Sequence, residues 1–429
     1  WLEFMTGLAG GWGGGSCQSW NKFSHHCTES KALFDTWHQM LSWFTRALRV
    51  GVKPAYQSTL RIQRISTMRA YMADERAVAM AAVRTACAIT TKVFKTLTSD
   101  ESVTKKDKSP VTIGDFSAQA AVNYILKKHF PQDSIVAEET STDLQGDAGK
   151  SIRDKVSHLV NEALQASGDI QQPLSDDDIL SSIDQGAFEG GSDARFWTLD
   201  PIDGTKGFLR GGQYAVCLAL IVNGHIELGV MGCPNLPRDV SQPKPKDGDI
   251  RHSSMEGLGV LFVAARGHGA FVAPINDTEA PLEPIHMRDL EGDFTRATFC
   301  ESVEAGHSSL GTNARIAQIL GMGDQHVRMD SQAKYASISR GDGDVYLRLP
   351  VGDGSYQEKI WDHASGSLLV AEAGGTVSDL AGRPLNFGLG RVLSANKGVV
   401  ACQSNMHAKV IEAVASALKE EGRSGLLSV

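Results

Sequence analysis

Three features that would assign this chain to a specialised class of protein are missing from its sequence. The cysteines number seven and are widely spaced, so we expect no disulfide framework and a reducing compartment. Lys and Arg are not in excess: the net charge is -8 and the isoelectric point is near 5.9, which argues against a general nucleic-acid surface. No stretch approaches the length of apolar residues that spans a bilayer, so we expect no membrane-spanning segment.

What remains is an ordinary globular composition. The chain has 429 residues, of which 41% are hydrophobic and 21% are charged, so it is long enough for one large or two medium domains with a substantial core. A small anionic ligand stays compatible with the negative net charge, because a few local cations can outweigh the overall field.

Residues 1–71 differ from the rest of the chain and form an atypical leader. Between Thr36 and Tyr71 there is no Asp or Glu, while Arg and Lys are spread among apolar residues, as in an organellar transit peptide. The alternative is a leader that is disordered or not translated, because Met68 and Met72 are both possible translation starts; we favour this alternative. We therefore expect a cytoplasmic protein, or a mitochondrial one if the basic leader is real.

The ordered part is expected to begin at Met72 and to form two halves, 72–237 and 238–429. Hairpins dominate the first half and strands alternate with helices in the second, which predicts an α+β half followed by an α/β half. Residues 141–190 are polar and rich in Gly, Asp and Ser, and we interpret them as a surface excursion around one helix. We expect helices at 72–97, 116–130, 152–165, 312–320, 332–339, 361–373 and 406–420. We expect strands at 134–137, 196–199, 214–222, 225–231, 258–265, 270–272, 326–329, 345–349, 376–380 and 398–403.

The segment Asp200–Thr205, with the sequence Asp-Pro-Ile-Asp-Gly-Thr, follows a strand and should turn sharply. Pro201 fixes its own φ angle, and Gly204 permits φ angles that other residues avoid. Such a turn can aim both carboxylates of the segment and the carbonyl of Ile202 at one point, and Mg²⁺ prefers oxygen ligands of this kind. The alternative is an Asx-type turn in which the carboxylates only accept backbone N–H bonds, and for the bare segment this alternative is the commoner outcome.

Other acidic residues stand at the ends of expected strands and helices. Glu138 and Glu139 follow the strand at 134–137, where a surface pair of this kind is most often only solvated. Asp115 and Asp362 stand at the starts of expected helices, where an acidic side chain caps N–H groups and stabilises the helix dipole. Each position is weak evidence taken alone, but together they suggest a cluster of carboxylates.

Longer stretches favour the metal site over the innocent alternatives. Trp197–Phe208 and Trp361–Gly375 resemble the two signatures of the lithium-sensitive inositol monophosphatase superfamily, and Ala137–Thr140 resembles its third, upstream signature. Ala137 stands where the superfamily usually has Gly. The resemblance covers about residues 72–420 and implies a layered αβαβα sandwich of the sugar and inositol phosphatase type.

Within that superfamily the chain resembles the 3'(2'),5'-bisphosphate nucleotidases, the salt-tolerance phosphatases of fungi. The stretches that carry this resemblance are Ser109–Asp115, Thr205–Arg210, Gln213–Ile221, Gly306–Ser309, Asp330–Tyr335, Tyr346–Pro350 and Tyr356–His363.

The resemblance implies a role for individual residues. It makes Asp115 and Thr205 the pair that orients and deprotonates the attacking water, with two or three Mg²⁺ ions as cofactor. Lys334 and Arg348 are then cations for a second, uncleaved phosphate; the alternative is two unrelated cations at the ends of elements. The implied metal ligands are Glu138, Asp200, the carbonyl of Ile202, Asp203 and Asp362. The implied substrate-binding residues are Gly204, Thr205, His307, Ser309, Ser331, Lys334, Arg348 and Asp362.

The function implied is hydrolysis of adenosine 3',5'-bisphosphate to AMP and phosphate, and also of 3'-phosphoadenylyl sulfate. Sensitivity to lithium and roles in salt tolerance and sulfate assimilation come with the resemblance. One alternative is an inositol polyphosphate 1-phosphatase, although Asp330–Tyr335 and Tyr346–Pro350 favour a nucleotide. Another is a catalytically silent bisphosphate sensor. We expect a monomer whose partner is the small substrate, without nucleic acid or membrane.

Overall fold

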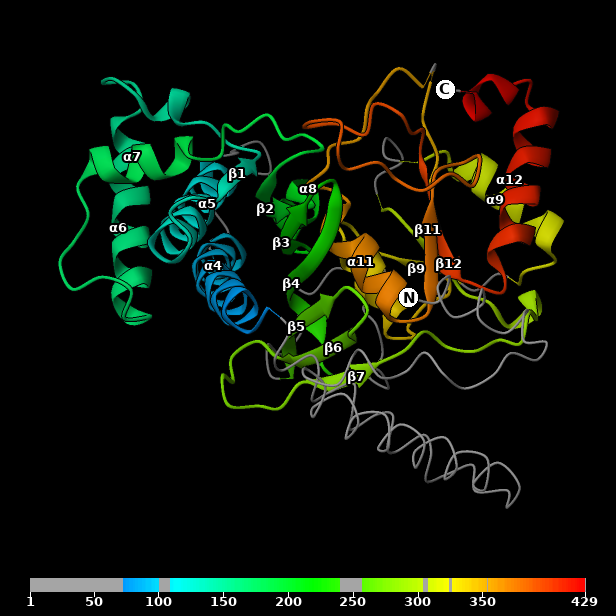
Figure 1. Cartoon of the computed structure of the whole chain (residues 1–429), viewed down its shortest axis with the longest axis horizontal. Helices are drawn as coiled ribbons and strands as arrows, with labels where there is room; N and C mark the ends of the chain where they lie inside the picture. Colours follow the sequence, from blue (N-terminus) through cyan, green and yellow to red (C-terminus); the bar gives the residue numbers. More distant parts are fainter. Residues whose placement is uncertain are drawn as a thin grey trace, which may run out of the picture. The chain divides into compact units, whose positions relative to one another are not determined.

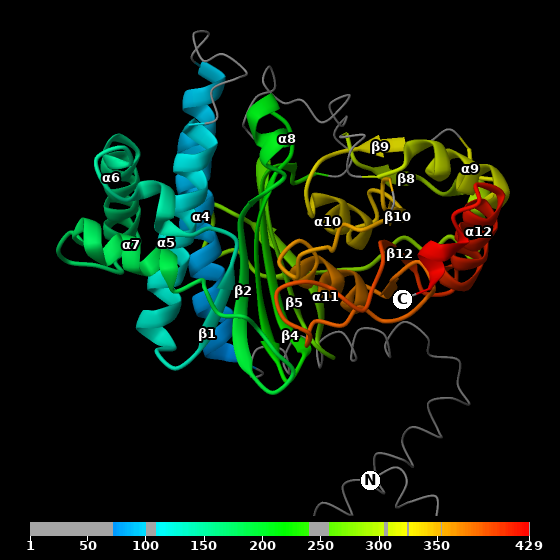
Figure 2. The same cartoon turned by 90° about the horizontal axis from the view of Figure 1, so that it is seen from above.

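The computed structural model describes residues 72–99, 109–239, 257–303, 308–323, 326–352 and 354–428. The predicted leader at 1–71 and the substrate candidate His307 lie outside the described residues. The described residues form two β-sheets that alternate with layers of helices, as Figure 2 shows from above.

The first sheet has seven strands in the order of the chain. The first two strands are parallel, and every later neighbour is antiparallel. Asn223 and Gly224, at φ angles of 51° and 76°, make the tight turn of the predicted hairpin. The strands are β1 (Ser134–Ala137), β2 (Arg195–Asp203), β3 (Ala215–Val222), β4 (His225–Pro237), β5 (Leu258–Ala265), β6 (Gly269–Pro274) and β7 (Glu283–Ile285).

Helices α4 (Ala73–Ser99) and α5 (Ser109–His129) pack against the first sheet and each other. Beyond them lie η1 (Ser141–Leu144), α6 (Lys150–Ala166) and α7 (Asp176–Asp184). By length and composition alone, Ala73–Thr96 of α4 could cross a membrane, contrary to our expectation from the sequence. However, 56% of its apolar 18-residue stretch is buried inside the protein. This is the behaviour of a core helix.

The second sheet has five strands in the order β11-β12-β10-β8-β9. Helices α10 and α11 lie between the two sheets, and α9 packs with α12 on the far side of the second sheet (Figure 1 and Figure 2). The strands are β8 (Phe299–Glu301), β9 (His326–Arg328), β10 (Val345–Arg348), β11 (Gly375–Ser378) and β12 (Val399–Gln403); the helices are α9 (Leu310–Leu320), α10 (Ala333–Ser339), α11 (Ala364–Glu372) and α12 (His407–Glu420), with short turns η3 (Phe294–Arg296) and η4 (Ser424–Leu427).

The layered αβαβα fold predicted from the sequence is confirmed, but two local expectations are wrong. Helix α5 begins at Ser109, so Asp115 lies in its second turn and does not start it. The region 141–190 is more than a surface excursion, because Val160 and Ile179 from it are fully buried in the core. It also contains α7, whose Ser175 forms a capping box. The half-boundary after residue 237 stays a prediction; it falls between β4 and β5 of one sheet.

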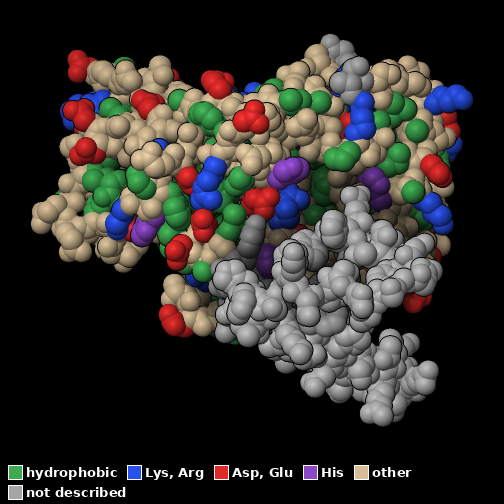
Figure 3. Space-filling view, in the orientation of Figure 1, with side chains coloured by type: hydrophobic (Ala, Val, Ile, Leu, Met, Phe, Trp, Pro, Cys, Tyr) green, Lys and Arg blue, Asp and Glu red, His purple; other side chains and the backbone are tan. Residues whose placement is uncertain are grey.

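Figure 3 shows the charged side chains on one side of the protein. There, acidic and basic side chains are interspersed and do not gather by sign. The five described cysteines are all buried.

Candidate active site

Two parallel strands bring the first acidic residues together. In the register of β1 with β2, Ala137 pairs with Leu199. The next residue on each strand is an acid, Glu138 on one and Asp200 on the other. Because parallel strands end at the same edge of a sheet, these two side chains meet although 61 residues of chain lie between them.

Strand β2 continues through Asp200 to Asp203, further than the predicted strand at 196–199, and the chain turns at Gly204. The pairing of β2 with β3 is irregular between Asp200 and Asp203, and Gly204 has a φ angle of 88°. A Cβ atom on Gly204 would lie 2.8 Å from the Cβ atom of Ser331, so glycine also allows the close approach of that segment. The side chain of Ile202 is fully buried in a small apolar cluster, which anchors the turn from below.

Helix α5 brings Asp115 to the same place. A Cβ atom on Gly114 would lie 2.8 Å from Cδ1 of Ile202, so the helix packs closely on the turn at this position. One helical turn later, Gln119 accepts a bond from the N–H of Glu139 at 3.0 Å and donates to its carbonyl at 2.7 Å. Gln119 therefore fixes the segment of Glu138 to the helix that carries Asp115.

The carboxylates form one electrostatically coupled cluster. Burial, Glu139 and Asp203 raise the pKa of Glu138 to about 7, although Glu138 keeps contact with solvent at the rim. Burial, and then Glu138, raise the pKa values of both Asp115 and Asp200. Burial also raises the pKa of Asp203 and Asp362, against the opposing effect of nearby cations. Because the raised pKa values disfavour the ionised carboxylates, an added positive charge would stabilise the cluster.

The arrangement fits a hard cation. Asp115 and Asp200 are only 6% and 2% exposed, and one carboxylate oxygen of each has no hydrogen-bond partner among the described residues. Unpartnered buried carboxylate oxygens are costly unless a cation or water binds them. Ligands that are all oxygens are those that Mg²⁺ prefers.

Thr205 lies at the start of helix α8 (Thr205–Arg210), where it is exposed. Its hydroxyl donates to the carbonyl of Ile202 at 3.4 Å, so it borders the turn that carries the predicted ligands. The pairing of Thr205 with Asp115 in water activation stays a prediction.

Two cations flank the acidic cluster. Lys334 is 2% exposed, and its ammonium donates to the carbonyls of Met329 at 3.3 Å and Ser331 at 2.8 Å. Burial lowers the pKa of Lys334, and Asp330 and Asp203 oppose this. Arg348 lies with Nη2 at 4.0 Å from Asp362. A buried lysine without a carboxylate bonded to it is suited to an anionic ligand.

The remaining substrate candidates divide. Ser331 is buried at the approach to Gly204 and has a φ angle of 68°, which is rare for a residue with a side chain. Ser309 stands before α9, and its hydroxyl bonds to that of Thr312 at 2.7 Å. Its neighbour Ser308 bonds to β10 on both sides of Arg348, so the segment borders the cations while the Ser309 side chain engages its own helix.

A buried hydrogen-bond network behind Arg348 was not predicted from the sequence. Glu358 accepts from Nε of Arg348 at 2.7 Å, and its second oxygen lies 3.2 Å from Nε2 of His363. The other ring nitrogen of His363 lies 2.8 Å from the hydroxyl of Tyr335. Although burial alone would raise it, the pKa of Glu358 falls to about 2 because of Arg348 and His363. Glu358 therefore stays ionised and holds Arg348, and its place in Tyr356–His363 was the available signal.

Arg391 was also missed, and nothing in the sequence marked it. It donates to the carbonyl of Ala137 at 2.5 Å and lies over the ring of Trp361 at 4.9 Å. It thus connects the residues that precede Glu138 and Asp362.

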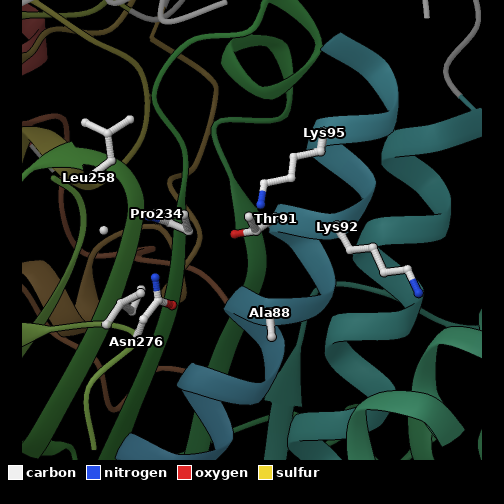
Figure 4. Close-up of a pocket in the computed structure, with 9 residues that line it drawn as sticks. Ala88, Thr91, Lys92, Lys95, Pro234, Leu258 and Asn276 are labelled. Carbon is white, nitrogen blue, oxygen red and sulfur yellow. The ribbon is translucent and has the colours of Figure 1, made fainter. Parts of the chain in front are cut away.

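A cavity of about 370 Å³ lies elsewhere, between α4 and the strands β4 and β5 (Figure 4). Lys95 points into this depression and Lys92 away from it, toward Glu162, to which it is bonded at 2.5 Å. None of the predicted site residues lines it.

The sequence of the chain is similar to a known protein family and to several named proteins. Residues 72–419 match the model of the Inositol monophosphatase family. A 3'(2'),5'-bisphosphate nucleotidase of Schizosaccharomyces pombe is 48% identical over 356 residues, covering 81% of this chain and 96% of that protein. One from Emericella nidulans is 48% identical over 351 residues (80% and 98% covered), and one from Oryza sativa is 40% identical over 356 residues (82% and 96% covered). The structure of an inositol monophosphatase from Anabaena is 18% identical, with a TM-score of 0.48, and covers 80% of this chain and 96% of its own. On the family match and these sequence identities, the chain belongs to the inositol monophosphatase family.

Proposed function

We propose that this protein is a Mg²⁺-dependent phosphomonoesterase that hydrolyses adenosine 3',5'-bisphosphate to AMP and phosphate, and also accepts 3'-phosphoadenylyl sulfate. The observation that carries the proposal is a cluster of buried carboxylates flanked by two cations, Lys334 and Arg348. The carboxylates suit metals at the phosphate that is cleaved, and the cations suit the phosphate that is retained. The names of the fungal and plant relatives support the nucleotide as substrate.

The residues divide the work in this proposal. Glu138, Asp200, the carbonyl of Ile202, Asp203 and Asp362 would hold two or three Mg²⁺ ions. When bound, Mg²⁺ offsets the negative charge of the phosphate and of the leaving oxygen. Asp115 accepts the proton of a water that Thr205 helps to orient, the water oxygen forms a bond to phosphorus, and the bond from phosphorus to the 3' oxygen of the ribose breaks. That oxygen leaves with a proton from solvent.

Lys334 is placed for recognition more than for chemistry. Within the described residues its ammonium donates two hydrogen bonds, both to backbone carbonyls, and an ammonium group has three donors. A phosphate that took the third donor would meet a cation already ordered by the fold, which reduces the entropy cost of binding. Arg348 is likewise ordered by Glu358.

The test is phosphate release from adenosine 3',5'-bisphosphate beside inositol 1,4-bisphosphate, each with Mg²⁺ and then with Li⁺ or Ca²⁺ added. We expect release from the nucleotide, dependence on Mg²⁺ and inhibition by the added ions. Preference for the inositol bisphosphate would favour the inositol polyphosphate 1-phosphatase alternative. Binding of the nucleotide without release under any condition would favour the sensor and refute the enzyme.

We also propose that the protein is a monomer and that it acts in the cytoplasm. Light scattering of the purified chain and fractionation of cells that produce it would check these two points, and a dimer or an organellar protein would contradict them.

A further inference from the structure

Gln332 occupies a position that the proposed chemistry has not used. It lies between Ser331 and helix α10, and it is 2% exposed. Two residues further along the chain is Lys334. Gln332 therefore lies within the site, but its amide side chain carries no charge that could bind a metal or a phosphate.

The side chain of Gln332 bonds to both sides of Asp362. Its Nε2 donates to the carbonyl of Trp361 at 2.7 Å, directly before that ligand. Its Oε1 accepts from the hydroxyl of Ser365 at 2.9 Å and from the N–H of Gly366 at 3.0 Å, at the start of α11. These three bonds fix the backbone on either side of Asp362.

The backbone of Gln332 contacts a second predicted ligand. Its N–H donates to the carboxylate of Asp203. This bond lowers the pKa of Asp203, against the larger effect of burial, which raises it. A single residue thus connects the turn after β2, the segment before α11 and the helix that carries Lys334.

We propose that Gln332 is a positioning residue that holds Asp203 and Asp362 at the spacing required for Mg²⁺ and couples that spacing to the place of Lys334. The inference rests on the proposed function, and in particular on these two residues as ligands. Groups that orient metal ligands typically change metal affinity by about 10- to 100-fold when they are removed. A glutamine that only stabilised the core would change stability without changing Mg²⁺ affinity.

The test compares Gln332→Met with Gln213→Met. Methionine has nearly the volume of glutamine but cannot replace these bonds. Gln213 is equally buried at 3% exposed, and its Nε2 donates to the carbonyl of Asn235 at 2.8 Å, away from the ligands. Calorimetric titration with Mg²⁺ alone measures affinity in the wild type and both variants, and thermal melting in EDTA measures stability.

We expect Gln332→Met to raise the Kd for Mg²⁺ by about 10- to 100-fold, while Gln213→Met leaves that Kd unchanged. In turnover of adenosine 3',5'-bisphosphate, raised Mg²⁺ should restore most of the kcat of Gln332→Met but leave its KM elevated, because Lys334 has lost its fixed place. A wild-type Mg²⁺ affinity in folded Gln332→Met, or an equal loss in Gln213→Met, would overturn the proposal.

A second variant keeps the test decisive if Gln332→Met does not fold. Ser365→Ala removes one donor to Gln332 and leaves its other bonds, so it should weaken Mg²⁺ binding by a few-fold, about the effect of one hydrogen bond. No change there would overturn the proposal. Failure of the proposed function is a separate result: the wild type would bind Mg²⁺, and Gln332→Met would bind it more weakly, but neither would release phosphate from the nucleotide.

Discussion

Removing the charge of Glu138 should make the stability of the metal-free protein depend less on pH. The pKa of Glu138 is about 7 in the folded chain, against 4.5 for an ordinary glutamate. Between these values the folded state holds a proton that the unfolded chain has released. The free energy of unfolding therefore falls as pH rises through this window, and its full contribution is present only below pH 4.5.

The size of the effect follows from the same shift. A change from 4.5 to about 7 corresponds to about 3 kcal/mol. The Glu138 side chain keeps contact with water, so we reduce this to about 1 kcal/mol. For a chain of this size, that is about 2 °C in Tm.

The assay is a set of thermal melts in EDTA between pH 5 and 7.5 for the wild type and Glu138→Gln. The variant should gain about 2 °C on the wild type across this range. The comparison is needed because His363 acts in the opposite direction: burial lowers its pKa, so its contribution is lost as pH falls below 6.5. That contribution is common to both proteins and cancels in the difference.

Glu162→Gln is the matched control. Glu162 is exposed on α6, and its bond with Lys92 lowers its pKa, so it stays ionised over the whole range. Its melting curve should run parallel to that of the wild type. A constant difference between Glu138→Gln and the wild type from pH 5 to 7.5 would refute the coupled acidic cluster. With Mg²⁺ present, the wild type should instead have a higher Tm than Glu138→Gln, because the wild type is stabilised more by the bound ion.

Three further predictions concern the site and its packing. Asp200→Asn should lower kcat by about 1000-fold while circular dichroism shows an intact fold; near-normal turnover with Mg²⁺ would remove Asp200 from the metal site. Lys334→Met should raise KM for adenosine 3',5'-bisphosphate by about 10-fold and that for adenosine 3'-monophosphate much less, and equal effects would exclude the second phosphate. Gly366→Ala would place a Cβ atom against the ring of Tyr335 and should cost about 1–3 kcal/mol in urea unfolding. Gly311→Ala, with nothing within 4 Å, should cost nothing, and equal losses would contradict this packing.

The parts of the site that the sequence predicted are those in which neighbouring residues act together. In Asp200–Thr205, strand, proline, carboxylates and glycine follow one another, so local rules are enough to predict the turn. The structure confirms the strand before it and the positive φ angle of Gly204. Lys334 was predicted to face a phosphate, but its burial was not predicted, since it depends on the fold of the chain around Met329 and Ser331, whose carbonyls accept from its ammonium.

What the sequence did not predict depends on contacts between distant segments. Gln119, Gln332 and Arg391 bond mainly to backbone carbonyls and amides 20 to 254 residues away. Backbone groups are the same at every residue, so no pattern of residue types marks their partners. Asp115 was placed at the start of a helix because the preceding residues look polar and loop-like. The six residues before it are helical in the fold, where Gly114 packs on Ile202.

The parallel pairing of β1 with β2 also sets the spacing of the acids without fixing the length of the exposed loops between the two strands. Hydrogen-bonded register, with Val136 opposite Thr198 and Ala137 opposite Leu199, sets the distance between the acids that follow. Helices α6 and α7 of the connection contribute to the core, so only its exposed loops can be lengthened, and doubling a flexible loop costs about 0.6 kcal/mol. Gly146 lies in one of these loops, is exposed and has nothing within 4 Å of an added Cβ, so new residues have room there. A reporter domain inserted there should therefore leave the predicted ligands Glu138 and Asp200 in place, and this loop could accept an additional domain.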